Sequence, residues 1–447
     1  MFWTPSPPRS IVDFLLNCNL LACVVKTMKK WFVFLIIGMA SLWSQSGQAQ
    51  GWDLQTCQDM GLKQNPKIQA ALQAVEGAGA RVKQSQADYY PSLFAESDYS
   101  RYRGSFAVAN SPPPAYDLYA HYLGLNQNIY DFGRREYKVQ SSKEDLKTYQ
   151  WDLKDIRLVV INEIRQAYFG VLLTQRIVKV RQEDLNRTQL HFEQARAFYQ
   201  IGLKARIDFT QAEVELIKAQ KALLKAQNDA KVTMVSLARA MGFDRPPPVT
   251  LKDNLETEKV VWKLEDLQKE ALEKHTLLNR LRSLKKYWEA QEKWANREFW
   301  PKLTGSARYG YSGASYPYEE TWMVGVQFNF PFFSGFQSQA KLAEIRAALN
   351  QTTANENTLK LQVLNDLQSQ FLNHQLAEKQ IEVARESLRS AKDNWEQAMG
   401  RYKTGVGAML EVTDARLSFS QAENDYVQAL YDYQIIRYQI EKTLGRE

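Results

Sequence analysis

The chain has 447 residues, and its 57 basic and 50 acidic side chains leave a formal net charge of +7. Because this charge is not gathered into one basic tract, the composition gives no footprint for nucleic-acid binding. The cysteines Cys18, Cys23 and Cys57 lack the spacing of a zinc site, and the four histidines are scattered. The sequence has neither a phosphate-binding glycine loop nor a nucleophile elbow. It therefore predicts no enzyme, no cofactor and no metal site.

The first 49 residues are predicted to be a signal peptide with an N-terminal extension. The signal itself spans 28–49, with a basic start, an apolar run at 31–42 and small residues before the expected cleavage after Ala49. The apolar run is too short to span a bilayer comfortably. A lipoprotein-like box ending at Cys23 is the alternative reading. Both readings imply export.

The first unit of the exported chain is expected to begin with a helix at about 54–87. Tyr90-Pro91 then leads into two strands, at about 93–106 and 116–130. The hairpin loop between them is expected at the breaker-rich Ser111–Pro114.

A very long helical stretch follows at 134–201. It contains no proline and a single glycine, Gly170, so it can extend for about 100 Å at 1.5 Å per residue. Gly202 ends it, and a second helix returns to Gly242. Apolar residues recur at spacings of three and four, which is typical of coiled coils. Such a helix has too little apolar surface for a globular core and must pack beside its neighbours.

The second unit repeats this plan after an inter-repeat segment at 246–263. A helix at about 264–298 precedes two strands, at about 302–311 and 321–330. Apolar and polar residues alternate clearly along both strands, which is the period-two signature of a sheet with one apolar face. A helix from 336 to 399 and a shorter returning helix close the unit.

Matched motifs show that the two units are copies of each other. The pairs are Tyr90 and Trp300, Pro91 and Pro301, Gly133 and Gly335, Tyr199 and Tyr402, Gly202 and Gly405, and Asp208 and Glu411. The last three pairs share a spacing of 203 residues. The duplication predicts one repeat at 50–245 and a second at 264–447.

The order, spacing and duplication of these motifs resemble the TolC family of outer-membrane factors. The resemblance implies a mainly α fold with a small β part, in which long antiparallel helices form a hollow α-barrel across the periplasm. It also implies a homotrimer, each protomer giving four strands to one twelve-stranded barrel in the outer membrane. Four strands cannot close around a pore, whereas twelve can, and open strand edges in lipid are prohibitive.

The function implied by the resemblance is the exit duct of a tripartite efflux or type I secretion system in the cell outer membrane. Its partners would be a periplasmic adaptor protein and an inner-membrane RND or ABC pump, with the tip helices around 190–215 and 393–420 as the docking surface. The competing hypothesis is a periplasmic coiled-coil scaffold without a pore. That scaffold would explain the helices but not two amphipathic strand pairs at matching positions.

Several residues are candidates for a role in the duct. The predicted pore aperture is formed by Asp208, Glu411 and Asp414, the periplasmic tip turns by Tyr199, Gly202, Tyr402 and Gly405, and the strand–helix junctions by Pro91, Gly133, Pro301 and Gly335. Glu411 and Asp414 are three residues apart and share a helical face, where a ring of carboxylates would favour cations. A solvated helix face is the plain alternative. Relatives often have a polar residue where this chain has Gly407, so Arg206 or Arg401 would have to replace it.

Overall fold

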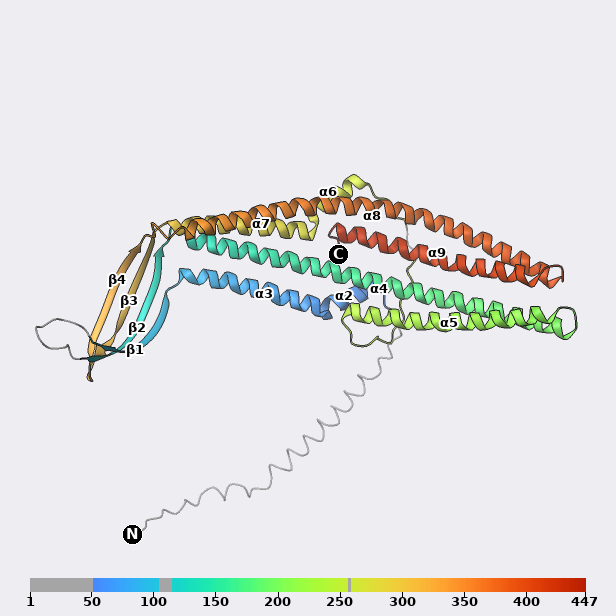
Figure 1. Ribbon diagram of the computed structural model, residues 1–447, viewed down its shortest axis with the longest axis horizontal. Coiled ribbons are helices and arrows are strands. Elements are labelled where there is room, and N and C mark those ends of the chain that lie inside the picture. Colours follow the sequence, from blue (N-terminus) through green and yellow to red (C-terminus); the bar gives the residue numbers. More distant parts are fainter. Residues whose placement is uncertain (1–50, 104–114, 256–258) are drawn as a thin grey trace, which may run out of the picture. The chain divides into compact units, whose positions relative to one another are not determined.

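A computed structural model describes residues 51–103, 115–255 and 259–447. The expected signal peptide and the hairpin loop at Ser111–Pro114 lie outside the described residues. The chain divides into two units, and all that follows concerns the second, Asp53–Glu447. In this unit the helices run side by side along one direction, and a small sheet stands at one end of them (Figure 1).

The helix before each strand pair is broken in two, whereas the sequence predicted one continuous helix in each unit. In the first unit α2 (Leu54–Gln64) ends at Asn65, and α3 (Pro66–Gln86) begins after it. The Asn65 side chain accepts a hydrogen bond from the Lys67 amide at 2.9 Å and donates one to the carbonyl of Ala240 at 2.9 Å. Pro66 at the first helical position lacks the N–H that would continue α2. In the second unit His275 separates α6 (Leu264–Lys274) from α7 (Thr276–Asn296).

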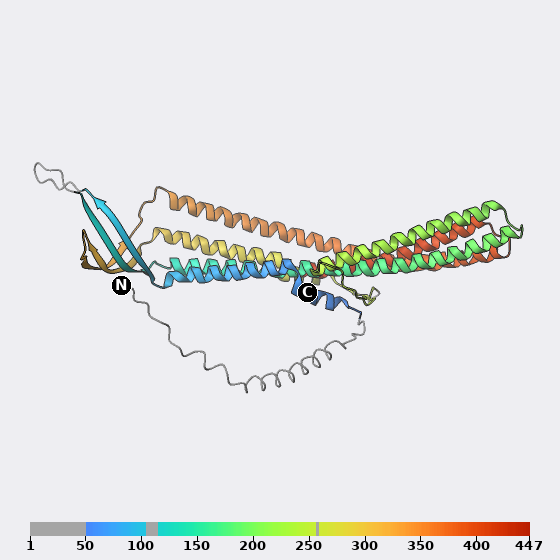
Figure 2. The same ribbon diagram turned by 90° about the horizontal axis from the view of Figure 1, so that it is seen from below.

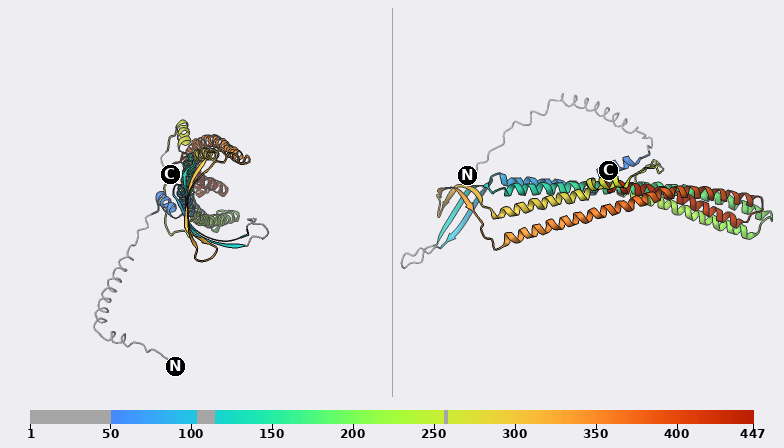
Figure 3. Two further views of the ribbon diagram at one scale, coloured as in Figure 1. Left: turned by 90° about the vertical axis from the view of Figure 1, so that its left-hand side faces the viewer. Right: turned by 90° about the horizontal axis from the view of Figure 1, so that it is seen from above.

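The four strands form one antiparallel sheet in chain order. They are β1 (Ser92–Tyr102), β2 (Tyr116–Tyr130), β3 (Lys302–Gly313) and β4 (Glu319–Asn329). The two hairpins, far apart in sequence, join through β2 and β3. Seen from the sheet end, the strands follow a curve with the helices behind them (Figure 3). Within the described residues, β1 and β4 each pair on one side only.

The two faces of the sheet differ in chemistry. One face carries large apolar side chains that are exposed in the protomer, namely Leu93, Leu123, Tyr309, Trp322, Val324, Val326 and Phe328. The other face carries polar residues, such as Asn126, Ser306 and Gln327, at the intervening positions. An apolar face of this size left uncovered indicates a surface that contacts another apolar phase or partner.

Two helices of 67 residues each, α4 (Arg134–Gln200) and α8 (Gln337–Lys403), run from the sheet to the far tip. At 1.5 Å per residue each is about 100 Å long. They turn at the tip into α5 (Arg206–Met241) and α9 (Met409–Thr443), which return about halfway. Figure 2 shows the two tip hairpins lying beside each other. The predicted long helices are therefore confirmed, and α4 continues through Gly170 without interruption.

The order of neighbouring helices defines the two sides of the protomer. Next to the sheet, α4 packs against α3 and α7, and α7 packs against α8. Toward the tip, α4 packs against α5 and α9, and α9 packs against α8. Hence α4, α7 and α9 are internal, while α3, α5 and α8 form the edges. Among the described helices, none is both long and apolar enough to cross a membrane.

The inter-repeat segment lies across the helices near the middle of the bundle. The Tyr168 hydroxyl of α4 donates a hydrogen bond to the carbonyl of Lys252 at 2.6 Å, and Arg176 pairs with Asp253 at 2.9 Å. Farther along, Lys259 pairs with Glu382 of α8 at 2.6 Å. The segment therefore connects α4 of the first hairpin with α8 of the second, in addition to the direct contacts between the helices.

Candidate functional site at the helical tip

Both tip turns depend on a glycine in the left-handed region. Gly202 has φ +74° and Gly405 has φ +80°, a conformation that costs glycine nothing but strains other residues. Each turn is closed by backbone hydrogen bonds to the preceding helix, from Leu203 to Phe198 at 2.9 Å and from Val406 to Arg401 at 3.1 Å. These turns lie at the ends of the two hairpins farthest from the sheet (Figure 1).

Gly407 has a packing reason to lack a side chain. Its amide donates a hydrogen bond to the carbonyl of Arg401 at 3.0 Å. A Cβ at this position would lie 2.9 Å from the Tyr402 amide nitrogen and 3.1 Å from the Arg401 Cβ. The second turn therefore folds back onto its own helix. The first turn has Lys204 at the matching position, 203 residues earlier.

The two turn tyrosines have opposite environments. Tyr199 is 41% exposed and stacks on Phe209 of its own hairpin, with ring centroids 5.7 Å apart. Tyr402 is fully buried, and its ring contacts Phe198 and the ammonium of Lys204, both from the other hairpin. Its hydroxyl finds no hydrogen-bond partner in the described part of the chain. Tyr402 is thus a contact between hairpins, whereas Tyr199 is not.

The structure brings two of the three predicted aperture carboxylates together. Glu411 and Asp414 are both exposed on the same face of α9. Arg401, one of the two arginines considered for the missing polar residue, pairs with Glu411 at 3.4 Å. The other, Arg206, makes no ion pair among the described residues.

Asp208 lies apart from this face, on the first hairpin. Asp208 is half-buried near Tyr402. The pKa of the Tyr402 phenol is raised mainly by burial of that ring and, to a smaller extent, by the negative charge of Asp208. Its surroundings are therefore the contact between the hairpins.

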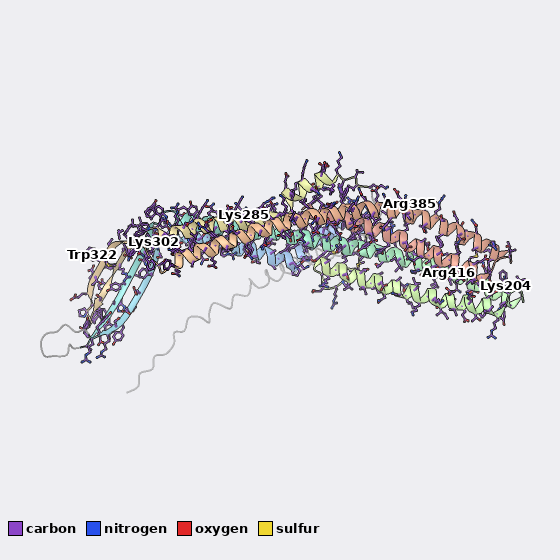
Figure 4. The ribbon with its side chains drawn as sticks, turned by 45° about the horizontal axis from the view of Figure 1, so that its top comes forward. Lys204, Lys285, Lys302, Trp322, Arg385 and Arg416 are labelled. Atoms are coloured by element: carbon purple, nitrogen blue, oxygen red, sulfur yellow. The ribbon has the colours of Figure 1, made fainter. Side chains whose placement is uncertain are left out.

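An arginine bridge, which sequence reasoning missed, joins the two hairpins at Arg416, two residues after Asp414. Arg416 of α9 donates to both oxygens of Asp184 on α4 at 2.8 and 2.9 Å, and to Glu215 of α5 at 2.8 Å. The Arg416 and Asp184 side chains are only 6% and 5% exposed. A buried guanidinium needs carboxylate partners to offset the loss of hydration, and here these partners come from α4 and α5 of the first hairpin. Arg416 is labelled on the tip half of the bundle in Figure 4.

The sequence did carry a signal for this bridge. Arg416 falls at helical spacing between Val412 and Phe419, which are both buried on the face of α9 that meets the first hairpin. A charged residue within an apolar stripe is rarely buried unless it is paired. The partners, however, lie 232 and 201 residues away and could not be identified from spacing alone.

A second set of polar contacts follows the bridge along the same interface. Arg187 of α4 pairs with Glu423 of α9 at 2.7 Å and lies over the ring of Phe419. Burial raises the pKa of Glu423, and the Arg187 guanidinium opposes that rise. Arg181 donates to the Ser420 hydroxyl at 3.0 Å. These contacts extend the junction between α4 and α9 toward the middle of the bundle.

His191 lies next to the arginine bridge in the core of the tip. It is 3% exposed, and neither ring nitrogen has a hydrogen-bond partner among the described residues. It lines a cavity of about 10 Å³ with Glu215, Arg416 and others. Burial, and then the charges of Arg416 and Lys403, lower the pKa of His191 to about 4. The imidazole is therefore neutral at pH 7.

The predicted strand–helix junctions lie at the sheet end. Gly133 and Gly335 precede α4 and α8 with φ of +88° and +61°. Pro91 and Pro301 stand directly before β1 and β3. A cavity of about 830 Å³ on the polar face is lined there mainly by polar residues, among them Asn128, Asp131, Arg134, Arg135, Lys138, Thr304 and Gln327.

No cluster of three or more histidine, cysteine or acidic residues that could hold a metal occurs in the described part of the chain. Cys57 is free and fully buried, and burial raises the pKa of its thiol to about 12. A thiol with so high a pKa forms almost no reactive thiolate at neutral pH.

Comparison with known sequences matches most of the chain. A family model described as "Outer membrane efflux protein" matches residues 59–243 and 267–446. The chain is 23% identical over 181 residues to "Outer membrane efflux protein BepC" of Brucella suis. It is 20% identical over 311 residues to "Probable efflux pump outer membrane protein TtgC" of Pseudomonas putida. These matches cover 40% and 66% of this chain and 39% and 63% of the relatives, so they span less than two thirds of either relative.

Solved structures share the fold. The outer membrane protein VceC of Vibrio cholerae superposes with a TM-score of 0.77 at 18% identity, covering 88% of this chain and 96% of that one. The CmeC outer membrane channel of Campylobacter jejuni superposes with a TM-score of 0.78 at 16% identity, covering 88% and 85%. At such identities the likeness shows the architecture alone: mainly helical, with long helices and a four-stranded antiparallel sheet.

Proposed function

Because this chain belongs to the Outer membrane efflux protein family, we propose that it is the outer-membrane exit duct of a tripartite efflux or type I secretion system. It conducts substrates passively, and the energy comes from an inner-membrane RND or ABC pump. The two repeats at 50–245 and 264–447, joined by the segment 246–263, together make one protomer of the duct.

The observation that carries this proposal is the sheet. Its apolar face is exposed, its opposite face is polar, and both edge strands have unpaired backbone on one side among the described residues. Unpaired N–H and C=O groups cost several kcal/mol each in lipid, so a sheet of this kind enters a membrane only if its edges are closed. Three copies supply twelve strands, enough to enclose a channel. Trp322, labelled on the sheet in Figure 4, and its apolar neighbours would then face lipid.

The helix edges support a homotrimer independently. Exposed apolar side chains line both outer helices of the tip half: Ile217, Leu224, Val232 and Val235 on α5, and Leu372, Leu376 and Val383 on α8. Many of their spacings are near three, four or seven residues, which is the pattern of coiled-coil contacts. In a ring of three protomers, the α5 edge of one copy meets the α8 edge of the next. Both stripes are then buried.

The aperture is proposed at the ring of Glu411 and Asp414. Three copies bring six carboxylates around the axis, where they repel each other and attract cations. Arg401 offsets one charge per protomer through its 3.4 Å contact with Glu411. Asp208, on the first hairpin, adds negative charge behind the ring.

The tip is also the proposed docking surface for the periplasmic adaptor. The turns expose Ile201, Leu203, Val406 and Leu410. Exposed apolar residues grouped at one end of a long helical bundle suit an end-on contact with another helical protein. A coiled-coil scaffold without a pore would share such tips, but it has no need for an exposed apolar sheet.

Single-channel recording in planar bilayers tests the proposal. The purified full chain should conduct and prefer cations. Glu411→Ala with Asp414→Ala should reduce that preference and change the conductance. The matched control is Glu386→Ala with Asp393→Ala, which removes two exposed acids of α8 away from the aperture and should leave selectivity unchanged. Wild-type protein that never conducts would refute the duct, and unchanged selectivity in the aperture variant would refute the carboxylate ring.

A further inference from the structure

Basic and aromatic side chains are concentrated where the helices meet the sheet. Arg134 and Lys341 lie over the ring of Trp294, and Arg135 lies over Tyr89. Most of these cations also have a carboxylate partner. Arg134 and Lys341 pair with Glu298, Arg135 with Asp131, and Lys138 with Asp88. Each of these four cations therefore contacts a carboxylate within the protomer, with Glu298 shared by Arg134 and Lys341.

Two cations of this junction are different. The Arg297 guanidinium lies 5.1 Å from the ring centre of Trp300 and 5.7 Å from that of Tyr137. The Lys293 ammonium lies 5.9 Å from the same Tyr137 ring. Neither cation pairs with a carboxylate among the described residues. Two like charges that share one ring repel each other, and the aromatic faces offset only part of that cost.

Arg297 and Lys293 lie outside the polar cavity at the sheet end of the helices. Arg134, Arg135 and Trp294 line the cavity on the polar face of the sheet, whereas Arg297, Lys293 and Tyr137 do not. Instead the Trp300 ring contacts Phe132, which contacts Tyr130. Tyr130 pairs in register with Leu303, on the apolar face. The pair therefore continues the face of the sheet that carries Trp322 and Phe328.

The pair also lies away from both edges of the protomer. Tyr137 belongs to α4, and Lys293 and Arg297 lie on or directly after α7, and these two helices are internal. Neighbouring copies meet at the edges α3 and α8 in the proposed ring, so they do not cover this position. The first repeat has Ala87 where the second has Arg297, counting 210 residues back as from Trp300 to Tyr90. Each protomer therefore has one such pair.

We propose that Arg297 and Lys293, held on the rings of Tyr137 and Trp300, bind the phosphodiester headgroup of an anionic phospholipid in the periplasmic leaflet. The inference rests on the proposed insertion of the sheet in the outer membrane. Arg297 lies five residues before β3, which is the depth of the headgroups if the sheet spans the hydrocarbon. A phosphate supplies the charge that no carboxylate supplies here, and guanidinium and phosphate match in geometry. The exposed ring of Trp300 contacts the part of the acyl chains next to the headgroup.

Native mass spectrometry of the full chain in detergent tests the site, with dioleoylphosphatidylglycerol, dioleoylphosphatidylcholine and inorganic phosphate as probes. The wild type should bind phosphatidylglycerol more tightly than phosphatidylcholine. Arg297→Gln with Lys293→Gln should weaken phosphatidylglycerol binding about tenfold and leave phosphatidylcholine binding unchanged. Trp300→Leu should weaken it by a smaller factor, because the charges remain. An unchanged melting temperature and assembly state show that the variants are folded.

The matched control is Lys285→Gln with Lys286→Gln, which removes two charges from the same helix, about 18 Å farther from the sheet than Arg297. It should bind phosphatidylglycerol like the wild type. Equal losses in both double variants, or none in Arg297→Gln with Lys293→Gln, would overturn the site. Displacement of the lipid by millimolar inorganic phosphate would overturn the lipid as ligand. Wild-type protein that conducts but shows no lipid preference would refute this inference alone, whereas absence of conductance refutes the duct.

Discussion

The two tip hairpins come from matching halves of the chain, yet they differ in what they bury. The α4–α5 hairpin exposes its turn tyrosine, whereas the α8–α9 hairpin buries Tyr402 against Phe198 and Lys204 of its neighbour. Both carboxylates of the arginine bridge come from the first hairpin, and the guanidinium comes from the second. A duplicated unit has thus become two complementary parts.

The positions that match the arginine bridge confirm this division. Counting 203 residues from Arg416, Asp184 and Glu215 leads to Glu213, Ser387 and Ser418, a set that contains no cation. The residues at the matching positions therefore cannot form a second copy of the bridge. The comparison teaches that the repeat specifies the shape of each hairpin, while a few non-repeated residues specify how one hairpin packs on the other.

The largest loss of stability is expected for Arg416→Met, because the arginine bridge has no counterpart elsewhere in the repeat. Removing the guanidinium leaves Asp184 buried without a cation and leaves Glu215 with its exposed partner Lys218 alone. A buried carboxylate that loses its partner destabilises a protein by about 4 kcal/mol. The loss should appear as faster proteolysis of the tip and a lower melting temperature. Arg389→Met, which removes an exposed partner of Glu386 on α8, is the control and should leave both unchanged. Equal behaviour of the two variants would contradict the bridge.

Replacing the two matched tyrosines tests the asymmetry of burial directly. Tyr402→Ala removes a fully buried ring and should destabilise by about 3 kcal/mol, whereas Tyr199→Ala, at a partly exposed ring, should cost about 1 kcal/mol or less. Tyr402→Phe should be neutral or stabilising, because the hydroxyl has no partner among the described residues. Chemical denaturation of the detergent-solubilised protein measures all three. Similar losses for both alanine variants would show that the hairpins are equivalent.

His191 makes the stability of the tip of the first hairpin depend on pH, and the second hairpin has Asn394 at the matching position. The folded pKa of His191, about 4, lies below the unfolded value of about 6.5, so the unfolded chain binds the extra proton between these values. The contribution to stability is complete above pH 6.5 and is lost as the pH falls toward 4, by about 3 kcal/mol.

The variant His191→Asn should lose less stability than the wild type between pH 7 and pH 4. Melting temperatures across that range measure the difference. Parallel curves for the two proteins would mean that the imidazole is not buried in its neutral form.

The smallest effect is expected at the turns. Gly407→Ala places a Cβ 2.9 Å from the Tyr402 amide nitrogen, which should cost about 2 kcal/mol. Gly400→Ala, seven residues earlier in α8, meets no atom within 4 Å and should stabilise by about 0.5–1 kcal/mol. Opposite signs in thermal denaturation would confirm that the second turn folds onto its own helix. A loss of stability in Gly400→Ala would contradict that reading.

Much of the fold was predictable from sequence because its signals are local. The scarcity of glycine and proline over 67-residue stretches predicts α4 and α8, and period-two alternation predicts β3 and β4. The break at Asn65 also has a local signal, an asparagine cap before a proline, which the prediction of one helix at 54–87 does not take into account. The break at His275 has no such signal, because no side-chain hydrogen bond of His275 caps α7.

The candidate site was predictable only in part, because its contacts are long-range. A spacing of three residues places Glu411 and Asp414 on one face of α9, and the structure agrees. The repeat suggests the same role for Asp208, but that carboxylate lies near Tyr402, at a contact between hairpins that the motif does not encode. The partners of Arg416 lie on two other helices. Only the packing of one hairpin on the other determines such pairs.

The account depends on three protomers closing the open edges of β1 and β4. The most direct measurement is the mass of the assembly extracted from the outer-membrane fraction in mild detergent, by light scattering or native mass spectrometry. The account predicts three copies of the chain that stay together and require detergent. A folded monomer that remains dissolved in detergent-free buffer would contradict it.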